Sequence, residues 1–140
     1  MSRFSFRKDE RLSGKKNVDR LFRTGSSFFV HPFKVYWLVT RDGIPYPAQT
    51  MIIVGKRSFK KAADRNRIRR QIREIYRLQK GELYAFLAKR EQQCLIAMIY
   101  STSQLMEFNE MSRKINLVFR RLINEIDIQL NNNKRSLSDI

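Results

Sequence analysis

The sequence contains few of the residues that most often carry catalysis or bind metals. It has one cysteine, Cys94, and one histidine, His31, among 140 residues. A single cysteine excludes an internal disulfide, and a single histidine excludes both a catalytic histidine pair and a histidine-rich metal site. The 13 acidic residues are scattered, so no carboxylate cluster indicates two-metal hydrolysis. We therefore predict no catalytic and no metal-binding residue in this chain.

Long apolar segments are also missing. No uninterrupted apolar run approaches the roughly 20 residues of a membrane-spanning helix. The first residues, MSRFSFRKDERLSGKK, lack the apolar stretch of a secretion signal. We expect a cytoplasmic protein with no membrane-spanning segment. Cys94 stands in the apolar run CLIAMIYS, which favours a packed thiol over a redox centre.

Positive charge, by contrast, is in large excess. The chain has 29 Lys and Arg residues, and its formal net charge is +16. This is far more than solubility requires, and such self-repulsion is typical of proteins with a polyanionic partner. Nucleic acid or an anionic membrane surface is therefore the leading class of partner. The 42% of apolar residues, with ten Phe, suffice for one compact core.

Hydrophobic periodicity predicts an α+β fold with the order helix, strand, strand, strand, helix, strand, helix. Gly25 is expected to end the first helix and Ser58 to cap the second, which Gly81 ends or interrupts. The expected strands cover 27–30, 33–41, 50–57 and 94–101, and the last helix covers 108–127. We predict three regions: a flexible basic arm over 1–11, a single RNA-binding domain over 12–128, and a disordered tail over 129–140.

The second strand has two different faces. Alternation places Phe33, Val35 and Trp37 on one face, which we predict to be core. Lys34 and Tyr36 point the other way, and a buried face would rarely hold both, so we predict an exposed face there.

The second helix concentrates basic residues on one side. At about 100° per residue, Ile68, Ile72 and Ile75 form a narrow apolar stripe that must face the core. An arc of about 100° on the opposite side holds five polar residues. Asp64 and Glu74 are the nearby acids, too few to neutralise the arc. A solvated face held by i,i+4 pairs is the alternative, but the i,i+4 neighbours Arg69 and Arg73 repel each other. The arc consists of Asn66, Arg69, Arg70, Arg73 and Arg77.

The segment GKRSFKKAADRNRIRRQIREIYR resembles the signature of the bacterial ribonuclease P protein component. That signature has a Lys/Arg pair closing a strand and then an R-N-R triplet, here residues 65–67, that runs into a basic helix. Upstream, RLSGKKNVDRLFRTGSSF is similar to the first helix of the family and FKVYWLV to its second strand. The resemblance extends in order over residues 8–126. The resemblance is specific because the triplet, the order of the elements, the size of the chain and its charge all agree.

The resemblance implies a two-layer sandwich like domain 2 of ribosomal protein S5, with a left-handed crossover. It also implies a protein subunit of ribonuclease P, in which the RNA subunit removes the 5′ leader of precursor tRNA with Mg²⁺ held mainly by that RNA. We expect one protein per RNA subunit, no membrane partner, and no cofactor bound by the protein alone. The residues expected to bind the catalytic RNA are Lys56, Arg57, Lys60, Lys61, Arg65, Asn66, Arg67, Arg69, Arg70 and Arg73.

The resemblance places the leader of precursor tRNA in a cleft between the first helix and the sheet, at Phe22, Lys34 and Tyr36. Aromatic rings there could stack on unpaired bases. Val18 stands where the family often has another aromatic. For Phe22, packing in the core is the alternative. For the whole chain, a sequence-nonspecific RNA chaperone or a ribosomal protein is the alternative, and a second, aromatic site away from the basic helix would discriminate against it.

Overall fold

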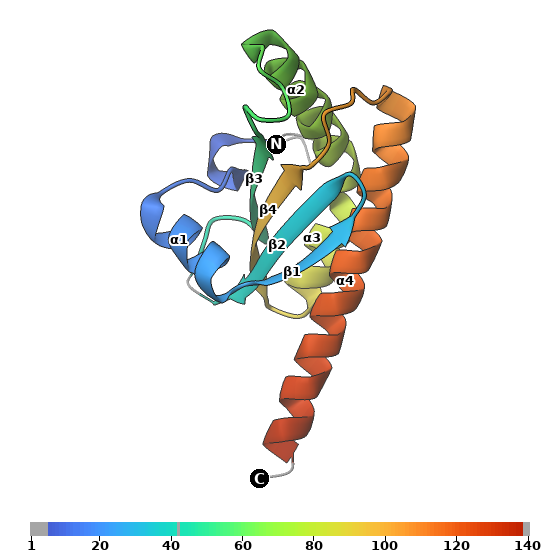
Figure 1. Ribbon diagram of the computed structural model, residues 1–140. Coiled ribbons are helices and arrows are strands. Elements are labelled where there is room, and N and C mark those ends of the chain that lie inside the picture. Colours follow the sequence, from blue (N-terminus) through green and yellow to red (C-terminus); the bar gives the residue numbers. More distant parts are fainter. Residues whose placement is uncertain (1–5, 42, 139–140) are drawn as a thin grey trace.

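The fold is built on one four-stranded sheet. The computed structural model describes residues 6–41 and 43–138 (Figure 1). Strand β2 pairs antiparallel with β1 and β4, and β3 pairs parallel with β4. All four expected strands are confirmed, in the spatial order β1-β2-β4-β3. Their bounds are β1 Ser26–Val30, β2 Phe33–Thr40, β3 Ala48–Val54 and β4 Gln93–Tyr100.

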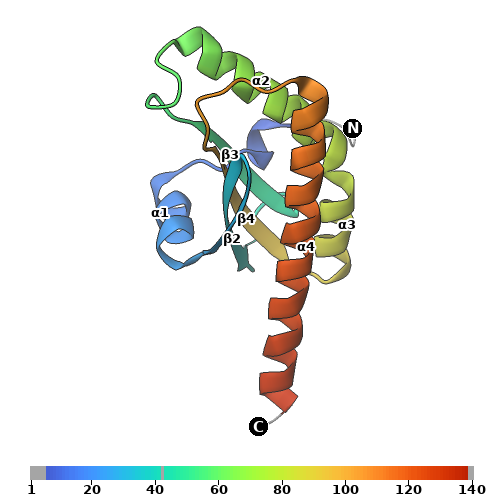
Figure 2. The same ribbon diagram turned by 45° about the vertical axis from the view of Figure 1, so that its right-hand side comes forward.

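Helices cover both faces of the sheet. Helices α2 (Ala62–Gln79), α3 (Gly81–Lys89) and α4 (Phe108–Ser138) lie on one face, and α1 (Lys15–Thr24) covers part of the other (Figure 2). The β3–α2–α3–β4 crossover joins the two parallel strands. The predicted α+β sandwich is thus confirmed. Within the described part of the chain, no helix combines the length and the apolar character needed to cross a membrane.

The apolar pattern of the sequence explains the two cores. The predicted stripe of α2, formed by Ile68, Ile72 and Ile75, is buried in the main core beneath the three helices. Strand β4 is buried on both faces, which is why it reads as a continuous apolar run. Its Cys94 side belongs to the main core, and its Leu95 side belongs to a smaller core under α1.

Gly25, expected as the residue that ends α1, is fixed by close approach and not by a left-handed backbone. Its φ is −74°. A Cβ at this position would lie 2.4 Å from the Leu21 carbonyl oxygen and 2.9 Å from that of Trp37. Only glycine therefore lets α1 end directly against the sheet.

The N-terminal segment corrects the flexible arm predicted for 1–11. Residues 1–5 lie outside the described residues, but Phe6 packs on Tyr76 with ring centroids 4.8 Å apart. A 3₁₀ helix, η1, covers Lys8–Glu10, and Glu10 is buried. The prediction failed because this short segment has no period of its own and is held by side chains distant in the sequence.

Two helix boundaries also differ from the predictions. Helix α2 begins at Ala62 with Lys61 at its N-cap, not at Ser58, because Phe59 is buried and the chain turns there first. Helix α3 was not predicted beyond the interruption at Gly81. Its short apolar face, with Leu83 and Leu87 one turn apart, explains the omission.

The predicted disordered tail, 129–140, is wrong as far as the structure describes it. Helix α4 continues to Ser138 instead of ending near Asp127. Residues 127–138 contain no Gly or Pro to stop a helix. The guanidinium of Arg90 lies 3.7 Å from the carboxylate of Asp127, so α4 is also tied to the end of α3. The sequence showed a loss of apolar period there, which is not the same as the end of a helix.

We predict that Cys94 does not react in the native protein, as expected for the packed thiol. The side chain is fully buried, and burial raises the pKa of the thiol to about 12. At pH 8 the thiolate, which is the reactive form, is therefore scarce and inaccessible. A chromogenic disulfide reagent should label no thiol in buffer and one in guanidinium chloride. An Asn109→Cys variant, at an exposed position of α4, should label once in buffer, whereas fast labelling of the unaltered chain would contradict the prediction.

Candidate nucleic-acid interface

The polar arc of α2 lines an open cleft of about 460 Å³. All five members of the predicted arc lie on it, so the structure brings them together as expected. The opposite wall comes from the N-terminal segment. We call this site the arginine cleft, and its lining residues are Phe6, Arg11, Asn66, Arg69, Arg70, Arg73, Glu74 and Arg77.

Arg11 and Phe6 are members of the arginine cleft that sequence reasoning missed. The guanidinium carbon of Arg11 lies 5.4 Å from the centre of the Phe6 ring, a cation–π contact. A backbone bridge between Arg11 and Thr50 fixes this segment to β3. The basic composition of 1–11 was the available signal, but only the tertiary fold places Arg11 opposite the helix.

Like charges crowd the arginine cleft. The pKa of Arg73 is lowered by desolvation and then by the nearby charges of Arg11 and Arg69. Glu74 is the only acidic side chain among the described residues lining the cleft. Its carboxylate lies 2.6 Å from the guanidinium of Arg77, which raises the pKa of Arg77 through a hydrogen bond. A bound polyanion would relieve the remaining repulsion.

Other predicted RNA-binding residues lie outside the arginine cleft. Arg65 donates hydrogen bonds to the backbone oxygens of Phe59, at 2.7 Å, and Lys60, at 3.0 Å. It therefore holds the loop before α2. Arg67 is exposed on another side of the helix. The remaining four lie exposed in the loop between β3 and α2, and they are Lys56, Arg57, Lys60 and Lys61.

Aromatic side chains gather on the opposite face of the sheet, beside α1. The rings of Phe22 and Tyr36 meet edge to face with centroids 4.8 Å apart. The ammonium of Lys34 lies 5.7 Å from the centre of the Tyr36 ring. Phe22 is 37% exposed, which rules out the alternative of a core aromatic, whereas Phe33 is buried as predicted.

Phe29 extends this aromatic set and was missed in the sequence. It is 50% exposed on β1 and stands directly opposite Lys34 in the sheet register. Strand alternation was the available signal, because its neighbour Phe28 is buried in the main core. Val18 is partly buried against the smaller core and does not extend the set. We call Phe22, Phe29, Lys34 and Tyr36 the aromatic face.

The arginine cleft and the aromatic face offer charge and stacking surfaces. Guanidinium groups bind phosphates, and exposed rings stack on unpaired bases. Over the described residues, no group of three or more His, Cys, Asp and Glu side chains is arranged to hold a metal ion.

Comparisons with known proteins show which family this chain resembles in sequence and fold. Residues 6–123 match the sequence model of the family described as Ribonuclease P. The Ribonuclease P protein component of Porphyromonas gingivalis is 30% identical over 110 residues, which are 79% of this chain and 80% of that protein. The one from Chlorobaculum tepidum is 35% identical over 94 residues, 62% of this chain and 61% of that protein. The solved RNase P protein from Thermotoga maritima superposes with a TM-score of 0.64 at 25% identity, covering 80% of this chain and 96% of that structure.

Proposed function

The chain belongs to the ribonuclease P protein family, and we propose that it binds the catalytic RNA of a bacterial ribonuclease P and the 5′ leader of precursor tRNA. The observation that carries the proposal is the pairing of two RNA-compatible surfaces. The arginine cleft lies on α2, and the aromatic face lies beside α1 on the other side of the sheet.

The arginine cleft is the proposed contact to the catalytic RNA. Guanidinium groups bind phosphate oxygens in pairs, and Asn66 can both donate and accept hydrogen bonds in the same cleft. The loop residues between β3 and α2 would extend this contact with four further charges. The repulsion around Arg73 supports the proposal, because phosphates would replace it with attraction.

The aromatic face is the proposed contact to the leader. A leader is single-stranded, so its unpaired bases can stack on Phe22 and Tyr36 while Lys34 meets a phosphate. Both surfaces present mainly cations and aromatic rings, which bind RNA without acid–base chemistry. We therefore propose that the RNA subunit performs the cleavage with its Mg²⁺, that one protein serves one RNA, and that the complex is cytoplasmic.

We predict that replacing Arg70 and Arg73 with alanine weakens binding to the catalytic RNA. Both side chains are exposed and line the arginine cleft, so folding should persist. A charge-assisted hydrogen bond contributes about 1.5 kcal/mol or more, so affinity should fall roughly tenfold per arginine. The plot of log affinity against log salt concentration should become less steep by about two. Each phosphate contact that is lost reduces by about one the number of counterions released on binding. Filter binding across a salt series measures both quantities.

The matched control replaces Arg113 and Arg120 with alanine, two exposed arginines of α4 that line no described cleft. It removes the same charge and should change affinity and salt slope much less. Equal losses in both double variants would mean that net charge, not the arginine cleft, drives binding. Unchanged affinity in a folded Arg70→Ala, Arg73→Ala variant would remove the cleft from the interface.

A further inference from the structure

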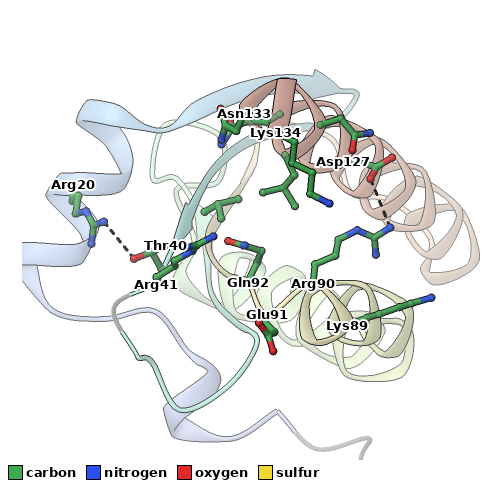
Figure 3. A pocket seen from close by; sticks show the side chains of 14 residues that line it. Arg20, Thr40, Arg41, Lys89, Arg90, Glu91, Gln92, Asp127, Asn133 and Lys134 are labelled. Carbon is green, nitrogen blue, oxygen red and sulfur yellow. Dashed lines mark hydrogen bonds and ion pairs between the residues drawn. The ribbon is translucent and has the colours of Figure 1, made fainter. Parts of the chain in front are cut away.

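A second basic pocket shares no lining residue with the arginine cleft (Figure 3). The volume of this pocket is about 680 Å³. Part of its wall comes from the C-terminal part of α4, which extends toward one end of the molecule (Figure 1). Helix α2, whose polar arc lines the arginine cleft, lies toward the other end in both ribbon views. We call this second site the basal pocket, and it is lined by the end of β2, the turn between α3 and β4, the C-terminal part of α4, and Arg20 of α1.

The lining of the basal pocket is cationic and polar. The lining includes five cationic side chains and two acidic ones, Glu91 and Asp127, which leaves an excess of three positive charges. Four side-chain amides and only two aliphatic side chains, Val39 and Leu130, complete much of the lining, so the pocket does not suit an apolar ligand. The cations come from separate elements, and the side chain of Lys89 points outward at the rim (Figure 3). They are Arg20, Arg41, Lys89, Arg90 and Lys134.

Specific contacts hold the walls of the basal pocket in place. The guanidinium of Arg90 stacks 3.9 Å from the centre of the Phe86 ring and lies 3.7 Å from Asp127 on α4. Arg20 of α1 donates a hydrogen bond of 3.3 Å to the hydroxyl of Thr40 at the end of β2. The pocket is therefore a property of the folded chain and not of a free tail.

The α4 wall lies beyond the region matched by the family. That match ends at residue 123, whereas the pocket uses α4 residues from Asp127 to Lys134. The part of α4 that the sequence suggested was a disordered tail is thus the part that closes this pocket.

We propose that the basal pocket binds backbone phosphates of RNA as a second electrostatic contact of the complex. This inference rests on the proposed function. Cations suit phosphates, and side-chain amides suit ribose hydroxyls and base edges. One free phosphate could pair with only part of a cationic set spread over several elements, whereas a phosphodiester chain presents successive charges. The shape and charge therefore favour RNA over a small phosphorylated ligand.

The test replaces Arg41, Lys89 and Lys134 with glutamine, which removes three charges and leaves the Arg90–Asp127 contact intact. Affinity for the catalytic RNA, or affinity of the assembled complex for precursor tRNA, should fall tenfold or more. The matching salt slope should fall by about two to three. The two RNAs are measured separately, so the arm that changes identifies which one supplies the phosphates. Thermal unfolding confirms that the triple variant folds.

The control triple, Arg113→Gln, Lys114→Gln and Arg120→Gln, removes the same charge from the other half of α4 and should have little effect. If the basal-pocket variant binds both RNAs like the control while Arg70→Ala, Arg73→Ala loses affinity, this inference fails and the proposed function stands. If neither variant loses affinity, both fail. In a last experiment the protein is titrated with inorganic phosphate, and binding is measured by the fluorescence of Trp37. Trp37 lines an adjoining cavity, which has Gln129 and Asn133 in common with the basal pocket. Saturable phosphate binding with unchanged RNA affinity in the triple variant would overturn the assignment to RNA.

Discussion

Replacing Glu10 with glutamine should destabilise the protein by roughly 3–5 kcal/mol, because it leaves the ammonium of Lys80 buried without its counter-charge. The two side chains form an ion pair in which Glu10 is 1% and Lys80 5% exposed. The hydroxyl of Tyr84 and the backbone N–H of Arg7 also donate to this carboxylate, each at 2.8 Å. Such a loss is a large fraction of the 5–15 kcal/mol that usually stabilises a folded domain.

Urea denaturation at neutral pH measures this loss as a lower midpoint of unfolding. Asp9→Asn is the matched control, because Asp9 is the exposed neighbour in the same 3₁₀ helix, and its effect should stay within about 0.5 kcal/mol. A double change, Glu10→Leu with Lys80→Met, removes both charges and should recover most of the stability. Equal stability of Glu10→Gln and Asp9→Asn would show that the buried pair does not anchor the segment.

The same ion pair connects stability to the proposed interface. Arg11 follows Glu10 directly, and its place in the arginine cleft depends on the anchoring of η1 against α2 and β3. A chain in which Glu10 no longer holds this segment would lose one wall of the cleft. On the proposed function, the buried charge would act on RNA binding by positioning Arg11 and not by contacting RNA.

The hydrophobic pattern of the sequence correctly predicted those strands and helices in which buried residues recur at a regular spacing of a few positions. The alternation of β2 separated buried Phe33 from the other side, where Tyr36 is only half-buried against the smaller core, and the stripe of α2 gave the correct helix face. The N-terminal segment could not be predicted in this way, because Glu10 and Lys80 are 70 positions apart. A contact of that separation leaves no periodic trace in either segment.

In the candidate sites too, some features could be predicted from local sequence pattern and others depended on the tertiary fold. The polar arc of α2 followed from helical geometry alone, and the structure places all its members on one cleft. Arg65 belonged to the resemblance, but its bonds to the loop backbone appear only when the turn before α2 is known. Likewise, helical spacing could not decide whether Phe22 was core or surface. That depended on how closely α1 approaches the sheet, and its ring lies against Tyr36 at the surface.

The second large effect is expected at the aromatic face. Replacing both Phe22 and Tyr36 with leucine keeps most of the apolar bulk but removes the flat rings. Each lost base stack should weaken binding of precursor tRNA to the assembled complex by about 1–3 kcal/mol. Mature tRNA lacks the leader, so its affinity should not change. Binding of the catalytic RNA should also persist, because the arginine cleft lies on α2 and is untouched.

Fluorescence titration of the complex with precursor and mature tRNA measures this difference, and Phe108→Leu is the control. Phe108 is an exposed aromatic of α4, 40% accessible, outside the aromatic face, and its replacement should leave both affinities unchanged. A selective loss for precursor tRNA would distinguish a leader-binding subunit from a sequence-nonspecific RNA chaperone, which would treat the two tRNAs alike. Equal losses for both tRNAs would contradict a leader contact. So would an unfolded double variant, because it would show that exposed Phe22 and half-buried Tyr36 are needed mainly for packing, and the leader would have to bind elsewhere.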